Sequence, residues 1–211
     1  MGKAAHVLLG LLLTAVPGGA QTNDHLYSPS TNLERSELAQ LETAARAVDI
    51  AMYSFTDREL AEELATLARK GVRVRVYRDR EQFSQETQWG GPTTTSILLA
   101  SGVEVWVKGA RDLMHLKSYA IDGRLLRTGS ANWSPTGLKR QDNDVLYESS
   151  PEAVERFEQK LRKCGLNRPT RVPHPGTLDC WTANHLNTQR ATYAEAHSLC
   201  SLFLRSSCYT S

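Results

Sequence analysis

The sequence predicts an α/β domain in which a mixed β-sheet lies between helices. Along residues 33–163 the apolar residues switch repeatedly between helical spacing and strand spacing, and the switches fall at turns or helix-capping residues. The chain has 211 residues, of which 40% are hydrophobic and 23% charged. It is therefore long enough to bury one core and unlike a disordered or membrane-embedded chain.

A β-α-β unit is expected in the first half of this region. Residues 33–47 carry apolar side chains at helical spacing, and a strand follows at 49–55. Thr56 stands where a helix N-cap is expected, with Glu59 three positions on, and this helix should run to residue 70 with Leu60, Leu64 and Leu67 buried. Residues 72–77 alternate between apolar and polar side chains, which is typical of a strand with one polar face.

The second half continues the alternation. Residues 81–92 are polar and contain Gly and Pro, so we expect a connecting segment there. A short helix at 95–100 and a strand at 103–107 should follow, then two strands around Asp122-Gly123 and a strand near 145–147. The last helix, 151–163, has Pro in its first turn. Alternating elements of this kind predict an α/β sandwich.

Residues 1–20 are predicted to be a signal peptide. Lys3 precedes an apolar run at 7–16, Pro17 ends the run, and small residues precede Gln21. The alternative is an uncleaved membrane anchor, but the run is much shorter than the roughly 20 residues that span a bilayer. We therefore expect a secreted or periplasmic protein with no stable membrane insertion after cleavage of the signal.

The C-terminal segment 165–211 lacks the alternating pattern. We expect residues 21–164 to form the folded domain and 165–211 an appendage of unknown structure. The chain's four cysteines lie at or beyond residue 164: Cys164, Cys180, Cys200 and Cys208. In an exported chain they permit two disulfides that would tie this appendage, and three pairings are open.

The stretch around Asp122-Gly123 carries the residues that predict chemistry. If the turn has two residues, residue 117 pairs with 128 and residue 115 with 130. His115, Lys117, Thr128, Ser130 and Asn132 then project from one face of the sheet. The ammonium, hydroxyl and amide groups suit a phosphodiester, and the imidazole can attack phosphorus to form a covalent phosphohistidine. This chemistry needs no metal or other cofactor, and no metal-ligand motif stands nearby.

The same register separates Asp122 from His115 by seven strand residues, or about 23 Å at roughly 3.3 Å per residue. Asp122 should therefore shape the turn or meet a basic neighbour. An acid from another strand must orient His115. We expect Asp144 in this role, with Asp142 as the alternative.

These residues resemble the HKD signature of the phospholipase D superfamily. His115-x-Lys117, four further residues and Asp122 are followed by Gly129-Ser130-x-Asn132 at the family's spacing. The resemblance extends over roughly residues 25–163 and points to the single-motif members, which are bacterial endonucleases and mitochondrial cardiolipin hydrolases. It implies a phospholipase D-like fold and a phosphodiesterase with the following sites: catalytic His115, Lys117 and Asp122; phosphate-binding Lys117, Ser130 and Asn132; supporting Thr128, Asp142 and Asp144.

The family also implies that two HKD motifs meet in one active site. This chain has one such motif, so a homodimer that shares one site is expected. Asn143 stands where many relatives carry a Glu.

For the substrate we expect nucleic acid first, which would make the protein an endonuclease. The charge balance of 25 basic against 23 acidic residues requires a local basic patch rather than bulk attraction. Arg73 and Arg75 would bind the backbone and Trp133 would stack on a base; an ordinary solvated strand face is the alternative. A phospholipid head group is the second substrate, and an inactive phosphate-binding module the third hypothesis.

Overall fold

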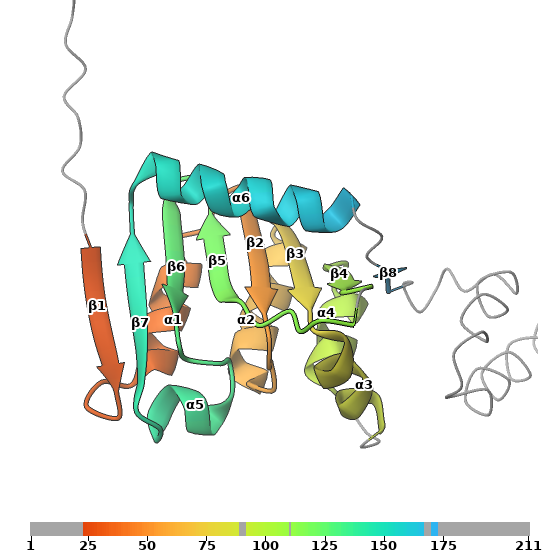
Figure 1. The fold of residues 1–211 in the computed structure, drawn as a ribbon, viewed down its shortest axis with the longest axis horizontal. Coiled ribbons are helices and arrows are strands. Elements are labelled where there is room, and N and C mark those ends of the chain that lie inside the picture. Colours follow the sequence, from red (N-terminus) through yellow and green to blue (C-terminus); the bar gives the residue numbers. More distant parts are fainter. Residues whose placement is uncertain (1–22, 89–91, 110, 167–169, 173–211) are drawn as a thin grey trace, which may run out of the picture.

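A computed structural model of the protein describes residues 23–88, 92–109, 111–166 and 170–172. These residues form an eight-stranded mixed sheet in the order β1-β7-β6-β5-β2-β3-β4-β8. The predicted α/β sandwich is therefore confirmed (Figure 1). The strands are β1 (Asn23–Ser28), β2 (Ala47–Met52), β3 (Arg73–Arg78), β4 (Glu104–Val107), β5 (Lys117–Ile121), β6 (Leu125–Gly129), β7 (Asn143–Glu148) and β8 (Thr170–Arg171).

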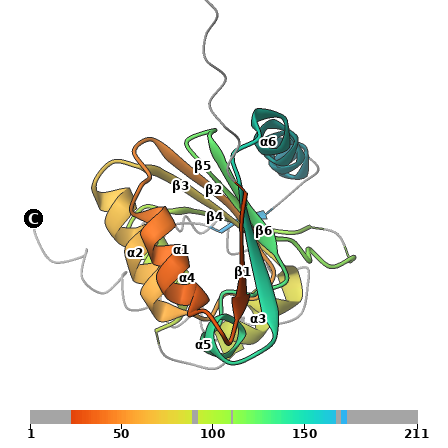
Figure 2. The same ribbon diagram turned by 90° about the vertical axis from the view of Figure 1, so that its left-hand side faces the viewer.

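Helices cover both faces of the sheet. They are α1 (Leu33–Leu41), α2 (Arg58–Arg69), α3 (Arg80–Gln88), α4 (Thr94–Ala100), α5 (Pro135–Lys139) and α6 (Pro151–Leu166). Figure 2 shows α1, α2 and α4 on one face and α6 on the other. The larger core includes Leu41, Leu64 and Val76, and a smaller core that includes Ala120 and Phe157 lies on the α6 side. Within the described ranges, no helix is both long and apolar enough to cross a bilayer.

The predicted β-α-β unit is formed by β2, α2 and β3, with β2 and β3 parallel. Leu60, Leu64 and Leu67 are buried as predicted. The N-cap of α2 is Asp57 rather than Thr56, and its carboxylate accepts a hydrogen bond from the Leu60 N–H at 3.1 Å. The predicted cap was one residue early because two neighbouring capping side chains competed for the same helix start.

Four elements were not expected from the sequence, one of which is the short helix α5. Helix α3 occupies much of the predicted polar connection, because Asp79 accepts hydrogen bonds from the N–H groups of Glu81 and Gln82 and so caps its first turn. Strand β1 pairs antiparallel with β7 at one edge of the sheet. At the other edge, β8 pairs antiparallel with β4, so residues 170–171 of the predicted appendage belong to the sheet. The predicted signal peptide lies outside the described residues, as do the side chains of the four cysteines.

The hairpin between β5 and β6 has a different turn from the predicted one. Tyr119 pairs with Arg127 and Ile121 with Leu125, so the loop contains Asp122, Gly123 and Arg124. This shifts the pairing by one residue relative to a two-residue turn. Both Asp122 and Gly123 adopt a positive φ, of 54° and 69°.

The Asp122 side chain holds this turn against the start of β2. Its carboxylate accepts hydrogen bonds from the backbone N–H groups of Ala45, Arg46 and Ala47 at 2.8–2.9 Å. Partial burial works in the opposite direction, but these donors keep the pKa of Asp122 below its ordinary value. As predicted, Asp122 shapes the turn, at the end of β5 that lies away from Lys117.

Gly129 ends β6 at a point where the backbones of β6 and β7 approach closely. Its φ is +147°, and a β-carbon there would overlap the backbone carbonyl of Asp144. We predict that Gly129→Ala lowers the free energy of unfolding by about 2–3 kcal/mol. Gly102→Ala is the matched control, since Gly102 has a φ of +81° but nothing within 4 Å of an added β-carbon. Urea denaturation should show a clearly smaller loss for Gly102→Ala, and equal losses would contradict the proposed steric clash.

Candidate active site

Several predicted site residues lie at one end of the central strands, where β2 and β6 end and β5 and β7 begin (Figure 1). Lys117 is the first residue of β5, and His115 lies two residues before it. Ser130 and Asn132 follow β6 directly. The sheet therefore brings the two halves of the motif together at the same end of the strands.

His115 and Lys117 form the centre of this site. The Lys117 ammonium lies 3.3 Å from Nε2 of His115 and 3.1 Å from the His115 carbonyl oxygen. The His115 side chain is exposed, whereas Lys117 is only 8% exposed. Burial, and after it the positive charge of Arg127, lower the pKa of Lys117. A partly dehydrated cation beside an exposed imidazole is a suitable site for a phosphate oxygen.

Tyr53 is a site residue that the sequence analysis did not identify. Its ring packs edge-on against His115 with the centroids 4.5 Å apart, and the Lys117 ammonium lies 5.1 Å from the Tyr53 ring centroid. The Tyr53 N–H also donates to the Leu116 carbonyl at 2.9 Å. It lies within the strand predicted at 49–55, but nothing in the sequence linked it to a residue 62 positions away.

Asn132 is fixed to the segment that follows β2. Its side-chain oxygen accepts a hydrogen bond from the Ser54 N–H at 3.4 Å, and the next residue, Trp133, donates its backbone N–H to the Ser54 carbonyl at 3.1 Å. Tyr53 contacts His115, so the pair Tyr53-Ser54 joins both halves of the motif. This arrangement leaves the Asn132 amide nitrogen as a donor for a phosphate oxygen.

Ser130 and Asp144 bind each other at the start of β7. The Ser130 hydroxyl donates to the Asp144 carboxylate at 2.5 Å, and the Ser130 N–H donates to the same oxygen at 2.9 Å. The other carboxylate oxygen lies 3.0 Å from Nε2 of His25, whose Nδ1 is 3.1 Å from the Tyr27 hydroxyl. These hydrogen bonds, led by that from the Ser130 hydroxyl, lower the pKa of Asp144 to about 2.

This geometry corrects the prediction for the acid that orients His115. The Asp144 carboxylate binds His25 and Ser130 instead of His115. Asp142 is exposed in the turn before β7 and does not take that role either. In the described part of the chain, the side-chain hydrogen bonds of His115 are to Lys117.

Thr128 is also displaced from the predicted face. Because the hairpin pairing is shifted by one residue, Thr128 lies opposite Ser118, and their hydroxyls hydrogen-bond at 3.1 Å. Side chains alternate along a strand, so Thr128 and Lys117 are on opposite faces of the sheet. Thr128 therefore supports the hairpin rather than the Lys117 site.

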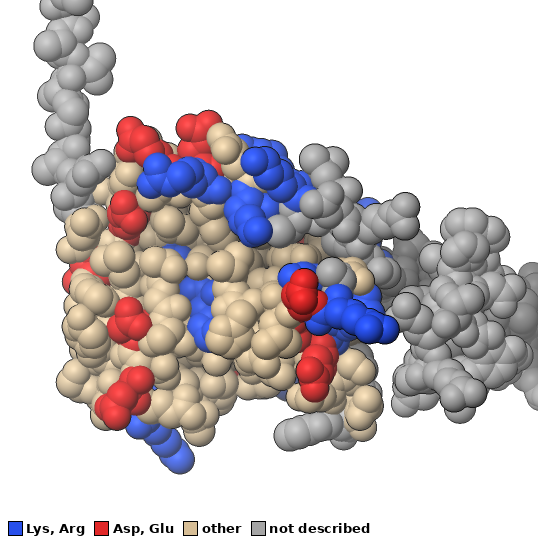
Figure 3. Space-filling view, viewed as in Figure 1, with Lys and Arg blue, Asp and Glu red and all other residues tan. Residues whose placement is uncertain are grey.

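The predicted nucleic-acid patch is not formed as expected. Arg75 and Arg73 both bind the buried Asp49, at 2.6 and 3.3 Å, because the polar face of β3 lies beside β2. Trp133 is 0% exposed and packs against Phe55 and Tyr119, so it is a core residue. Figure 3 shows basic and acidic side chains together along α6, above a surface made mainly of other residues.

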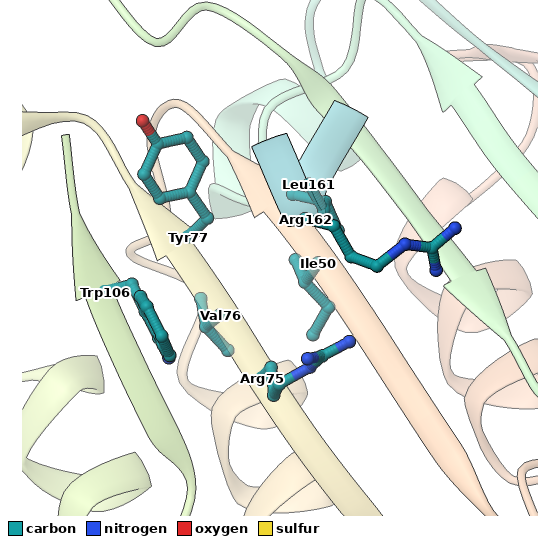
Figure 4. A pocket seen from close by; sticks show the side chains of 7 residues that line it. All are labelled: Ile50, Arg75, Val76, Tyr77, Trp106, Leu161 and Arg162. Atoms are coloured by element: carbon teal, nitrogen blue, oxygen red, sulfur yellow. The ribbon is translucent and has the colours of Figure 1, made fainter. Parts of the chain in front are cut away.

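A pocket of about 310 Å³ lies over β3 and β4 near the end of α6. Figure 4 shows Trp106 on one side of it and the Arg75 and Arg162 side chains on the other. The lining residues are mainly apolar, and none belongs to the HKD motif. Among the residues that the structure describes, no group of three or more His, Cys, Asp or Glu side chains is placed to hold a metal ion.

The fold and the site define an α/β domain with one HKD motif. Residues 38–164 match the family described as cardiolipin synthase, PLD-like domain. The chain belongs to this family, and hence to the phospholipase D superfamily. The predicted family is confirmed.

Curated relatives include mitochondrial cardiolipin hydrolases. The protein of Chlamydomonas reinhardtii is 32% identical over 148 residues, which cover 70% of this chain and 64% of that protein. The human protein is 29% identical over 129 residues, covering 61% of this chain and 49% of that protein. The chain thus spans less than two thirds of the length of these relatives.

Solved structures show the same fold. Nuc from Salmonella typhimurium, a phospholipase D family member, superposes with a TM-score of 0.64 at 18% identity and covers 72% of this chain and 98% of its own. NucT from Helicobacter pylori gives a TM-score of 0.63 at 22% identity and covers 72% and 99%.

The hydrogen bonds to the Asp144 carboxylate can be tested through the pH dependence of the protein's free energy of unfolding. Its pKa is lower in the folded protein, so its stabilisation is present above about pH 4 and is lost as the pH falls towards about 2. We predict that Asp144→Asn costs about 1 kcal/mol at pH 7, allowing for solvent screening of a side chain that is 32% exposed. Denaturation curves between pH 2 and 7 measure this. Asp142→Asn, which removes the same charge two residues away, should show no such loss, and equal effects would contradict the assignment.

Proposed function

We propose that this protein hydrolyses phosphodiester bonds through a covalent phosphohistidine on His115. The observation that carries the proposal is the exposed imidazole of His115 beside the partly dehydrated ammonium of Lys117. Lys117 and Asn132 would bind the non-bridging oxygens, where negative charge increases in the transition state. Membership of the phospholipase D superfamily supports this assignment.

The proposed reaction has two steps. A ring nitrogen of His115 attacks phosphorus, the bond to the leaving oxygen breaks, and an imidazolium protonates that oxygen. Water then attacks the phosphohistidine and the P–N bond breaks. The imidazole that had protonated the leaving oxygen takes the proton from this water. The product is a phosphomonoester, and the enzyme returns to its starting state. The residues of the motif supply this chemistry without a metal or another cofactor.

The second imidazole is proposed to come from another copy of the chain. A single HKD motif provides one His115, and the reaction needs both a nucleophile and an acid. His115 is exposed at the end of the central strands, which leaves it accessible to a second copy. Size-exclusion chromatography with light scattering tests this part of the proposal. A fully active monomer at all concentrations would overturn the shared site.

For the substrate we propose nucleic acid, cleaved internally. An exposed nucleophile at an open edge of the sheet suits a phosphodiester within a long polymer. Because residues 1–20 are predicted to be a signal peptide, we place this activity in the periplasm or outside the cell.

A phospholipid is the second candidate substrate, and two observations favour it. The curated relatives at 26–32% identity are named for cardiolipin hydrolysis. In addition, the side chains expected to contact nucleic acid are engaged elsewhere, since Arg73 and Arg75 bind Asp49 and Trp133 is buried.

The experiment is to incubate the protein, in excess EDTA, with labelled single- and double-stranded DNA and separately with cardiolipin vesicles. We predict that His115→Gln lowers activity on the true substrate by about 10⁴-fold, because no nucleophile remains. His115 is exposed, so the thermal midpoint should stay unchanged. Cleavage of DNA alone supports the nuclease, and cleavage of cardiolipin alone supports the phospholipase. Inactivity on both, or full activity of His115→Gln, would overturn the proposal.

A further inference from the structure

Arg127 is a buried cation that lies between the two halves of the motif. It is on β6 and is 0% exposed. Its Nη1 donates to the Lys117 carbonyl at 2.5 Å, and its Nη2 donates to the Ala131 carbonyl at 3.1 Å. Lys117 belongs to the segment that carries His115, and Ala131 lies between Ser130 and Asn132. One rigid, planar group therefore binds the backbone of both segments.

Glu37 of α1 holds this cation in place. Nε of Arg127 donates to the Glu37 carboxylate at 2.6 Å, and both side chains are 0% exposed. Burial, followed by the charge of Glu37, raises the pKa of the neighbouring Tyr119, so the carboxylate lies within a buried polar cluster. A buried ion pair can often be replaced by apolar residues without loss of stability. Fold stability alone therefore gives no reason for a charged pair at this position.

We propose that Arg127, held by Glu37, is a positioning residue that sets the distance between the His115–Lys117 segment and the Ser130–Asn132 segment. The inference rests on the proposed function of that site. The guanidinium contacts backbone carbonyls and not the reacting groups, so it acts through the residues that those segments carry. Displacement of catalytic groups by about 1 Å can cost about 100-fold in rate, which makes the spacing of the two segments important.

The charge of Arg127 has a second effect on the site. After burial, it is the next cause that lowers the pKa of Lys117. The other groups beside the ammonium are His115 and the ring of Tyr53, and Glu37 lies on the far side of Arg127. Removing the positive charge should let Lys117 keep its proton to higher pH. The pH at which the Lys117 ammonium loses its proton, measured by NMR of the lysine side chain, should then rise.

Two variants separate geometry from charge. Glu37→Gln/Arg127→Met removes both charges, so neither is left unpaired in the core. Arg127→Lys keeps the positive charge, but a lysine ammonium lacks the planar set of donors that lets the guanidinium bind Glu37 and both carbonyls. Glu34→Gln/Lys139→Met is the matched control, since this 2.5 Å pair also anchors α1 but contacts no residue of the motif.

We expect the double variant at positions 37 and 127 to lower kcat by about 10- to 100-fold and to raise the pH at which the Lys117 ammonium titrates. Arg127→Lys should lower kcat by a similar factor and leave the titration of Lys117 unchanged. The control should change neither. If the double variant does not fold, Arg127→Lys alone decides the inference. A folded double variant, or a folded Arg127→Lys, with kcat within about twofold of the wild-type value would overturn it.

Failure of the proposed function would be recognised separately. If the original protein cleaves neither DNA nor cardiolipin, the binding of inorganic phosphate is compared by calorimetry instead. Tighter binding by the original protein than by the two Arg127 variants, with the control unchanged, would support the positioning role. Equal binding by all of them would overturn it.

Discussion

The buried charge of Arg127 is the constraint on which the arrangement of the site depends. A guanidinium inside a core must find acceptors for its donors, because an unpaired charge there is far more costly than an unpaired neutral group. Here the acceptors come from α1, from the start of β5 and from the loop after β6. The helix layer, the central strand and the loop with Ser130 and Asn132 are thereby fixed together. An interaction in the interior thus joins the elements that meet at the site.

Much of the fold could be predicted because its determinants are local. The stripe of Leu60, Leu64 and Leu67 and the alternation of residues 72–77 show their structure within a few positions of sequence. The motif around His115 and Lys117 was equally visible, because its residues lie on two adjacent strands joined by a short loop. The local spacing of these residues was sufficient to identify the end of the strands at which they meet.

The rest depended on partners distant in sequence. The Asp122 carboxylate binds three N–H groups 75–77 residues away, and this contact accompanies a three-residue loop that moves Thr128 to the other face. Arg75 alternates with apolar residues as on a solvated strand, but Asp49 of the neighbouring strand neutralises it. Trp133 follows Asn132 directly, yet its parallel bridge with Phe55 takes the indole into the core. Similarly, Asp144 binds His25 because β1, which the sequence did not reveal, pairs with β7.

The two outermost strands determine how the sheet meets other molecules. At one edge β1 presents the exposed polar residues Asn23, Asp24 and His25, and at the other β8 has two residues. Short or polar edge strands resist pairing with the strands of another molecule. The sheet is therefore poorly suited to growth by addition of further strands, in the manner of a fibril.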